Sequence, residues 1–258
     1  MEDGPVSPLM SLDHVSVRFG GLLALSDVSF EVFANEIVGL IGPNGAGKTT
    51  AFNAACGFIP PTSGTVHFPA LGHHNLRPNQ LARAGVARTL QGVGLFGHLS
   101  VIENVMAGAI SNPGGSVFSG FLGLPRATRH EKETREAAMT MLDRFGVAKY
   151  ARSMPGGLPY GIAKKVSVAR ALVGGPRLLL LDEPASGLDE QEIDEFAEII
   201  AGLKSQMSVL LVEHNMDFVM PLVERLIVLD FGEVIAVGSP AEISNNDAVL
   251  AAYLGVDG

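Results

Sequence analysis

The stretch that decides the fold class of this chain reads Gly42-Pro43-Asn44-Gly45-Ala46-Gly47-Lys48-Thr49. It matches the phosphate-loop pattern G-x-x-x-x-G-K-[ST] at every position. Its three glycines allow the backbone to form a nest of N–H groups that converge on an anion. Lys48 adds a positive charge that reaches the outer phosphates, and the Thr49 hydroxyl is a ligand for Mg²⁺. We therefore predict a nucleotide-binding loop rather than a glycine-rich turn that binds nothing.

The residues on either side of the loop supply the strand and helix that it needs. Residues 36–41 (EIVGLI) form an apolar run that predicts a buried strand leading into the loop. Residues 48–55 (KTTAFNAA) predict a helix whose positive dipole end faces the phosphates. The predicted nucleotide-binding residues here are Gly42, Asn44, Gly45, Ala46, Gly47, Lys48, Thr49 and Thr50.

The rest of the chain predicts an α/β fold with a mostly parallel sheet. The apolar run Leu178–Leu181 is typical of a strand that is covered on both faces, as in a parallel sheet. Residues 12–19 and 28–32 alternate like half-buried strands, which predicts additional antiparallel strands near the N-terminus. Further strands are predicted at 65–68, 86–89, 177–182, 208–213, 226–230 and 234–238, and helices at 190–204 and 216–223.

A helical block interrupts this pattern between about residues 92 and 160. Ser100 and Glu103 have the spacing of a capping box, so a helix should run from Ser100 to about Ile110. A charged surface helix is predicted at 127–145, after an exposed loop at 111–126, and another helix at about 161–173. We predict one domain, 9–258, with a core (9–91 and 161–258) and an inserted helical subdomain (about 92–160), after a disordered tail (1–8).

Composition narrows the class of protein. The 258-residue chain has a formal net charge of −9, which argues against nucleic acid as a partner. It contains no run of about 18 apolar residues, so no transmembrane helix is expected, and residues 1–5 do not resemble a secretory signal. The single cysteine, Cys56, cannot form an intramolecular disulfide, which agrees with a reducing cytoplasm.

Candidate catalytic residues follow the predicted strands. Asp182 ends an apolar strand, where a carboxylate can hold Mg²⁺, and Glu183 is placed to orient or deprotonate an attacking water. His214 follows the next apolar strand and can donate a hydrogen bond to a γ-phosphate, although a lone histidine there is more often structural. The Gln91 amide can reach the metal or the water, although in isolation it is an ordinary loop residue.

Taken together, these residues resemble the nucleotide-binding subunit of an ATP-binding cassette (ABC) transporter over nearly all of residues 9–255. The resemblance implies an ATPase with a RecA-like core that binds ATP and Mg²⁺. It implies catalytic roles for Glu183, His214 and Gln91, and metal contacts from Thr49, Gln91 and Asp182. Asp189, in the D-loop, and Phe19, where the family places an aromatic that stacks on adenine, would contact the nucleotide; for Phe19 a core strand position is an equal alternative.

The signature motif of that family is altered in this chain. The pattern Leu-Ser-Gly-Gly-Gln is replaced by Leu158-Pro159-Tyr160-Gly161-Ile162. Pro159 cannot provide the serine hydroxyl, but the N–H groups of Tyr160 and Gly161 and the helix dipole can still contact ATP on the opposite subunit. The tyrosine, the Q-loop region, the insertion around 116–122 and the C-terminal region resemble the longer ATPase of branched-chain amino acid importers more than the lipopolysaccharide-export ATPases.

The resemblance also implies partners and a location. The expected partners are membrane permease subunits and a second ATP-binding subunit, identical or related, with no nucleic acid and no direct contact with the transported substrate. The chain would be cytoplasmic and peripheral on the inner face of the cell membrane. Two alternatives stay open: a regulatory ATP-binding cassette with little hydrolysis, and a lipopolysaccharide-export-type ATPase. A cassette ATPase acting on DNA or ribosomes is disfavoured by the acidic charge.

Overall fold

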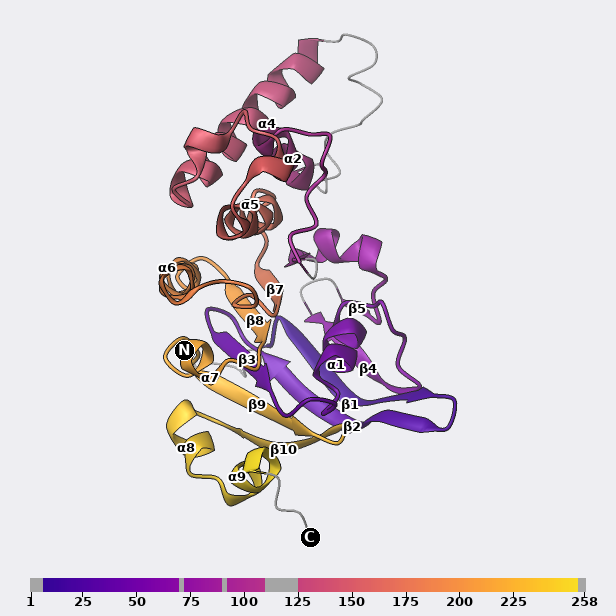
Figure 1. The fold of residues 1–258 in the computed structure, drawn as a ribbon. Helices are drawn as coiled ribbons and strands as arrows, with labels where there is room; N and C mark the ends of the chain where they lie inside the picture. Colours follow the sequence, from indigo (N-terminus) through magenta and orange to yellow (C-terminus); the bar gives the residue numbers. More distant parts are fainter. Residues whose placement is uncertain (1–6, 70–71, 90–91, 110–124, 255–258) are drawn as a thin grey trace, which may run out of the picture.

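The computed structural model describes residues 7–69, 72–89, 92–109 and 125–254 (Figure 1). In these residues a six-stranded sheet lies at the centre, in the order β10-β9-β3-β8-β7-β6. Only β10 is antiparallel to its neighbour, which confirms the predicted, mostly parallel sheet. The strands are β3 (Ile37–Ile41), β6 (Val86–Arg88), β7 (Leu178–Asp182), β8 (Ser208–Val212), β9 (Arg225–Asp230) and β10 (Glu233–Gly238).

A second, antiparallel sheet contains the N-terminal strands, as predicted. Its described strands are β1 (Met10–Phe19), β2 (Leu22–Val32), β4 (Ser63–Phe68) and β5 (His73–His74), in the order β2-β1-β4-β5. The prediction that the second strand begins at Val28 is wrong, because it begins at Leu22. Phe19 pairs directly with Leu22 across a tight turn, so the pairing of β1 with β2 extends to the end of the hairpin.

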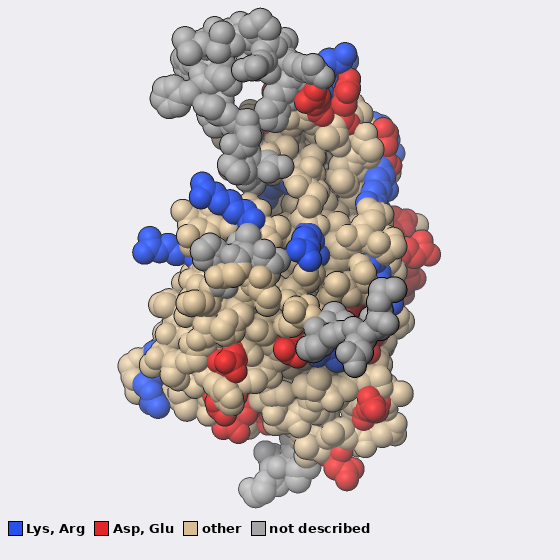
Figure 2. Space-filling view, turned by 180° about the vertical axis from the view of Figure 1, so that it is seen from behind, with Lys and Arg blue, Asp and Glu red and all other residues tan. Residues whose placement is uncertain are grey.

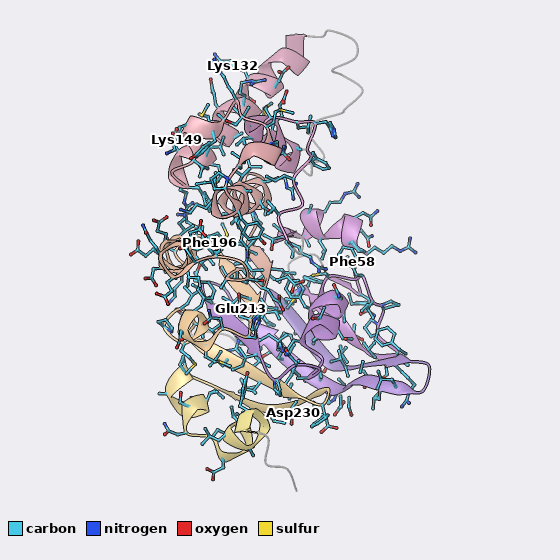
Figure 3. All side chains as sticks on the ribbon, viewed as in Figure 1. Phe58, Lys132, Lys149, Phe196, Glu213 and Asp230 are labelled. Atoms are coloured by element: carbon cyan, nitrogen blue, oxygen red, sulfur yellow. The ribbon has the colours of Figure 1, made fainter. Side chains whose placement is uncertain are left out.

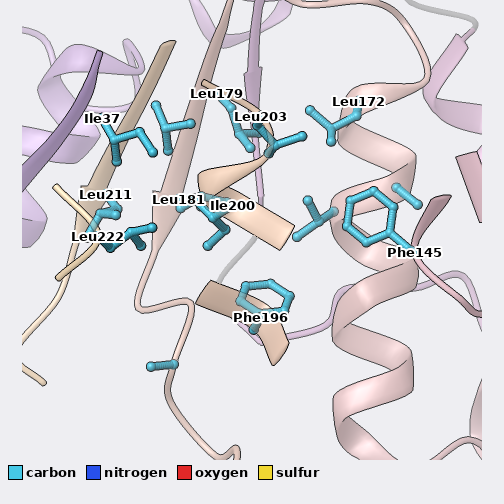
Figure 4. Packing of buried hydrophobic residues seen from close by; sticks show 14 of the residues in the cluster. Ile37, Phe145, Leu172, Leu179, Leu181, Phe196, Ile200, Leu203, Leu211 and Leu222 are labelled. Carbon is cyan, nitrogen blue, oxygen red and sulfur yellow. The ribbon is translucent and has the colours of Figure 1, made fainter. Parts of the chain in front are cut away.

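The central sheet has an apolar cluster on each face, and alternate residues of one strand enter different clusters. On β7, Leu178 and Leu180 pack with α1 (Lys48–Ala55) and the antiparallel sheet. Leu179 and Leu181 point to the opposite cluster, among Leu172, Phe145 and Phe196 (Figure 4). This two-sided burial explains why residues 178–181 of β7 and 209–212 of β8 are apolar without alternation.

The helical block lies at one end of the molecule (Figure 1). It comprises α2 (Val101–Ala109) and α4 (Pro125–Arg144), and α5 (Tyr160–Leu172) packs against both. The predicted helix start is confirmed, since the Ser100 N–H donates to Glu103 Oε2 at 2.8 Å. Val105 and Leu142 share one apolar cluster with the central sheet, so the block is packed continuously onto the core. The division into a core and a subdomain stays a prediction.

Three short 3₁₀ turns and four helices complete the described elements. The turns are η2 (Pro78–Ala84), η3 (Ala148–Tyr150) and η4 (Pro155–Gly157), and the helices are α6 (Glu190–Ala201), α7 (Met216–Val219), α8 (Pro240–Ser244) and α9 (Asp247–Leu254). The prediction of a helix to residue 223 is wrong, because Pro221 has no N–H to continue α7. Glu224, directly before β9, donates its N–H to the Ile37 carbonyl at 3.0 Å, and β9 then pairs with β3.

The surface carries both signs of charge. On the face shown in Figure 2, basic and acidic side chains are interspersed among a larger uncharged area. Among the described residues, none of the helices combines the length and the apolar character needed to cross a membrane.

Candidate functional site

The loop that leads from β3 to α1 is organised around a buried lysine. The Lys48 Nζ donates hydrogen bonds to the carbonyl oxygens of Gly42 at 2.7 Å and Pro43 at 2.8 Å. Burial lowers the pKa of Lys48, and the nearby Glu183 carboxylate opposes this effect. The Glu183 carboxylate therefore lies near enough to Lys48 to act on its charge, although 135 positions separate the two residues in the sequence (183 − 48).

Two glycines of the loop are required by the backbone packed beneath it. Gly42 has a φ of +151°, and a Cβ there would lie 2.1 Å from the Leu229 carbonyl oxygen of β9. Gly47 has a φ of +100°, and its Cβ would lie 2.9 Å from the carbonyl oxygen of Ala24. In contrast, Gly45 has no atom within 4 Å of a Cβ and is exposed with Asn44. The loop is thus packed on one side and open on the other.

Asp182 lies at the end of β7 with its carboxylate almost fully buried. The Arg88 guanidinium, at the end of the neighbouring strand β6, lies 3.4 Å from Asp182 Oδ2. Arg88 is itself held between the rings of Phe52 and Phe58, each 4.7 Å away. Burial raises the pKa of Asp182, and Arg88 works against that rise. Sequence reasoning missed Arg88, whose only signal is a cation at the end of a buried strand.

Glu183 and His214 lie close together, because they follow the adjacent parallel strands β7 and β8. Glu183 Oε1 lies 3.8 Å from His214 Nδ1, and both side chains are accessible to solvent. The backbone of Glu183 has a φ of +47°, a left-handed conformation that is uncommon for a residue with a side chain. Its N–H donates to the Val212 carbonyl at 2.9 Å, which ties this turn to β8.

A buried carboxylate that sequence reasoning did not single out lies beneath these two residues. Glu213 is 1% exposed and lies centrally in the molecule (Figure 3). Its Oε1 accepts a hydrogen bond from the Ala185 N–H at 2.6 Å. Its Oε2 accepts from the N–H groups of His214 at 3.0 Å and Asn215 at 3.3 Å. The available signal was an acidic residue directly after the apolar run at 209–212.

The altered signature motif begins α5 and lies against the start of α6. A Cβ on Gly161 would lie 2.2 Å from Glu192 Oε1, and a Cβ on Gly187 would lie 2.9 Å from the Tyr160 ring. Asp189 is the N-cap of α6, with its Oδ1 accepting from the Glu192 N–H at 2.9 Å. Tyr160, Gly161 and Asp189 therefore form one contact region, and their binding of a nucleotide stays a prediction.

The remaining predicted residues are more dispersed. Thr49 is exposed and Thr50 partly exposed, whereas Ala46 is buried and its carbonyl accepts from the Gly232 N–H at 3.0 Å. Phe19 is 50% exposed at the end of β1, so it is not the core residue that the alternative reading required. Gln91 lies outside the described residues.

Two oxygen donors of the site are of the kind that Mg²⁺ takes. Among the residues that the structure describes, none of the His, Cys, Asp and Glu side chains form a group of three able to hold a metal ion. The Thr49 hydroxyl and the Asp182 carboxylate are hard oxygen donors, and Mg²⁺ commonly takes one or two such protein ligands together with substrate phosphates and water.

A phosphate loop at a strand–helix junction, with acidic residues at the ends of neighbouring parallel strands, defines the nucleotide-binding core of a P-loop NTPase. A family model described as "ABC transporter" matches residues 25–186. The chain therefore belongs to the ABC transporter family, and the fold predicted from its sequence is confirmed. A second model, described as "Branched-chain amino acid ATP-binding cassette transporter", matches residues 233–258.

Curated relatives match the chain over almost its full length. The branched-chain amino acid transport ATP-binding protein LivG of Escherichia coli (strain K12) is 42% identical, covering 96% of this chain and 98% of LivG. BraF of Pseudomonas aeruginosa is 37% identical with the same coverage. The lipopolysaccharide export protein LptB of Escherichia coli (strain K12) is 31% identical, covering 96% of this chain and 98% of LptB. The predicted preference for the amino acid importers over the export ATPases agrees with this order.

Solved structures agree with the fold. A crystal structure of MJ1267, an ATP-binding cassette of an ABC transporter, superposes with a TM-score of 0.82 at 29% identity, covering 96% of this chain and 99% of that one. The ADP conformation of the same cassette superposes with a TM-score of 0.81 at 26% identity, with the same coverage.

Proposed function

We propose that this chain is the ATP-binding and ATP-hydrolysing subunit of a membrane importer for branched-chain amino acids or related small polar compounds. The observation that carries the proposal is the 42% identity to LivG over 96% of the chain. The match of residues 233–258 to a model of branched-chain amino acid cassettes supports the same substrate class from a separate segment.

The proposed chemistry assigns a role to each side of the site. Lys48 and the loop N–H groups bind the phosphates, while Thr49, Asp182 and Gln91 hold Mg²⁺. When bound, Mg²⁺ neutralises charge on the phosphate oxygens. Glu183 orients or deprotonates the attacking water, and His214 donates to the γ-phosphate. The 3.8 Å separation of Glu183 and His214 supports their joint action on one phosphate.

A second ATP-binding subunit completes the proposed site. The Tyr160–Gly161 segment of one subunit closes over the ATP bound by the other, which gives ATP a higher affinity for the closed pair and lets it drive a conformational change. Hydrolysis removes the γ-phosphate bridge, and the pair opens. The exposed Tyr160 ring and the exposed loop residues Asn44 and Gly45 leave both halves accessible for this contact.

The permease is proposed to dock beside residues 92–99 and the helical block. A cavity of about 410 Å³ lies there, between the sheet edge at β6 and the ends of α2 and α5. Phe96, Phe58 and Arg170 are among its lining residues. An apolar hollow with a few polar groups suits a protein segment from the permease.

Transport by the reconstituted complex tests the proposal. The chain is co-purified with its permease and reconstituted into proteoliposomes with the binding protein, and ATP-dependent uptake of labelled leucine is measured with valine, amides and urea as competitors. Uptake that requires ATP and is blocked by a branched-chain amino acid supports the proposal. The altered signature favours the alternative, a regulatory cassette, and that alternative predicts nucleotide binding without steady hydrolysis even in the complex.

A further inference from the structure

A second lysine of the site lies on the signature helix and has no role in the proposed chemistry. Lys164, on α5, is 6% exposed. Its Nζ donates hydrogen bonds to the carbonyl oxygens of Ser186 at 2.6 Å and Glu183 at 3.2 Å. Both carbonyls belong to residues 183–186, which we call the post-β7 turn. The lysine therefore joins α5 to the turn that carries Glu183.

The post-β7 turn is also held by a buried anion, Glu213. Glu213 accepts the Ala185 N–H at 2.6 Å, so the carbonyl groups of the turn contact a cation and one of its N–H groups contacts a carboxylate. Within the turn, the Ser186 N–H donates to the Glu183 carbonyl at 3.2 Å. Burial lowers the pKa of Lys164, and the carboxylates of Glu213 and Glu183 oppose this effect.

The turn needs such contacts because its first residue is strained. Glu183 has a φ of +47°, and a residue with a side chain keeps a left-handed conformation only where its surroundings fix it. This conformation sets the direction of the Glu183 carboxylate toward His214. A contact that stabilises the backbone of Glu183 therefore also determines where its carboxylate lies.

Lys164 also contacts the residue that begins the helix. Tyr160 is one helical turn earlier, and its ring centre lies 5.5 Å from the Lys164 Nζ. A buried ammonium is costly unless it is fully hydrogen-bonded, so packing alone would be served better by an apolar side chain. Lys164 therefore offsets the free-energy cost of its burial through the two hydrogen bonds that hold the post-β7 turn in place.

We propose that Lys164 is a positioning residue for ATP hydrolysis, which fixes the post-β7 turn and thereby the carboxylate of Glu183, from the helix whose start carries Tyr160. The proposal rests on the function proposed above. Because Tyr160 would face the ATP of a second subunit, Lys164 provides a physical link between that contact and the chain's own Glu183.

The experiment compares three variants in the purified permease complex. Lys164→Met removes the donors, Lys164→Arg restores them, and Lys165→Met is the matched control. Lys165 is the next residue of α5, and its Nζ pairs with Glu195 Oε2 of α6 at 2.7 Å. For Lys164→Met we expect kcat for ATP to fall roughly 10- to 100-fold, as for a misplaced catalytic group, with KM close to that of the wild type. Lys164→Arg should recover most of kcat, and Lys165→Met should keep it.

Several outcomes would overturn the inference. These are a wild-type kcat in Lys164→Met, a rise in KM alone, or a folded Lys164→Arg as slow as Lys164→Met. If Lys164→Met does not fold, as judged by thermal melting, Lys164→Leu replaces it, because its shorter apolar side chain also has no hydrogen-bond donor; a wild-type kcat there would also refute the inference. A complex whose wild type does not hydrolyse ATP contradicts the proposed function instead, so the two failures are distinguishable.

Discussion

The buried carboxylate of Glu213 accepts a 2.6 Å hydrogen bond from the backbone N–H of Ala185. This bond connects the end of β8 to the turn that follows β7. Because the same carboxylate also accepts the N–H of His214, one side chain fixes the backbones beside both Glu183 and His214. The relative placement of Glu183 and His214 therefore depends on a third residue, whose carboxylate hydrogen-bonds to the backbone of His214 and to the turn that follows Glu183.

Replacing Glu213 tests this arrangement. Glu213→Ala leaves three buried or partly buried N–H groups without their acceptor, and we expect it to lower the free energy of unfolding by about 3 kcal/mol. Glu213→Gln keeps one carbonyl oxygen as an acceptor and should cost clearly less. Urea denaturation followed by circular dichroism measures both. Equal, small effects of the two variants would show that these hydrogen bonds do not stabilise the turn.

Alanine substitutions at two glycines of the phosphate loop should destabilise the protein to different extents. Gly42→Ala places a Cβ 2.1 Å from the Leu229 carbonyl and adds strain at a φ of +151°, so we expect a loss of about 3 kcal/mol or more. Gly45→Ala meets no atom within 4 Å and carries only backbone strain at +84°, about 1 kcal/mol. Thermal melting of both variants checks the order. A Gly45→Ala variant less stable than Gly42→Ala would contradict the loop geometry.

The exposed pair of His14 and Asp27 should make the stability of the protein depend on pH. The His14 Nδ1 lies 2.8 Å from Asp27 Oδ1, and this hydrogen bond and the charge of Asp27 raise the pKa of His14 above its ordinary value of 6.5. Stability from this pair is thus fully present below pH 6.5 and is lost as pH rises through the folded-state pKa. In His14→Gln, melting temperatures across this range should lose that part of the pH dependence. Asp27→Asn should show the same change, and unaltered profiles in both would refute the pairing.

Replacing Lys48 tests whether the phosphate loop binds the nucleotide. Lys48→Ala removes a charged donor from the loop, and we expect affinity for ATP to fall roughly 10- to 100-fold, the range for one charge-assisted hydrogen bond. Lys132→Ala is the control, because that lysine is exposed at the outer part of α4 (Figure 3). Fluorescent-nucleotide titration measures both. Retained affinity in Lys48→Ala would contradict the phosphate-loop interpretation.

The parts of the fold with local signals could be predicted from the sequence. Residues 42–49 and their apolar flanks specify a strand, loop and helix by short-range pattern, and the structure confirms all three. The Ser100–Glu103 spacing likewise places the start of α2. The error at α7 arose from ignoring Pro221, and the late start given to β2 arose because its first residues are apolar without alternation.

The supporting residues of the site could not be predicted, because their partners are distant in the chain. Arg88 contacts Asp182, and Lys164 contacts Glu183 and Ser186, only after the strands and α5 assemble. A buried cation or carboxylate has no periodic signature of its own. The role of such a residue depends on which backbone N–H and carbonyl groups lack another hydrogen-bond partner nearby, and only the structure shows these groups.

The measurement that tests the central claim most directly is ATP binding and hydrolysis by the Glu183→Gln variant in the permease complex. The substitution keeps the size and hydrogen-bonding capacity of the side chain but removes its ability to accept a proton at neutral pH. We predict ATP affinity like that of the wild type together with a loss of turnover of roughly 100-fold or more. Turnover equal to that of the wild type would contradict the assignment of Glu183 and, with it, the account of how this chain hydrolyses ATP.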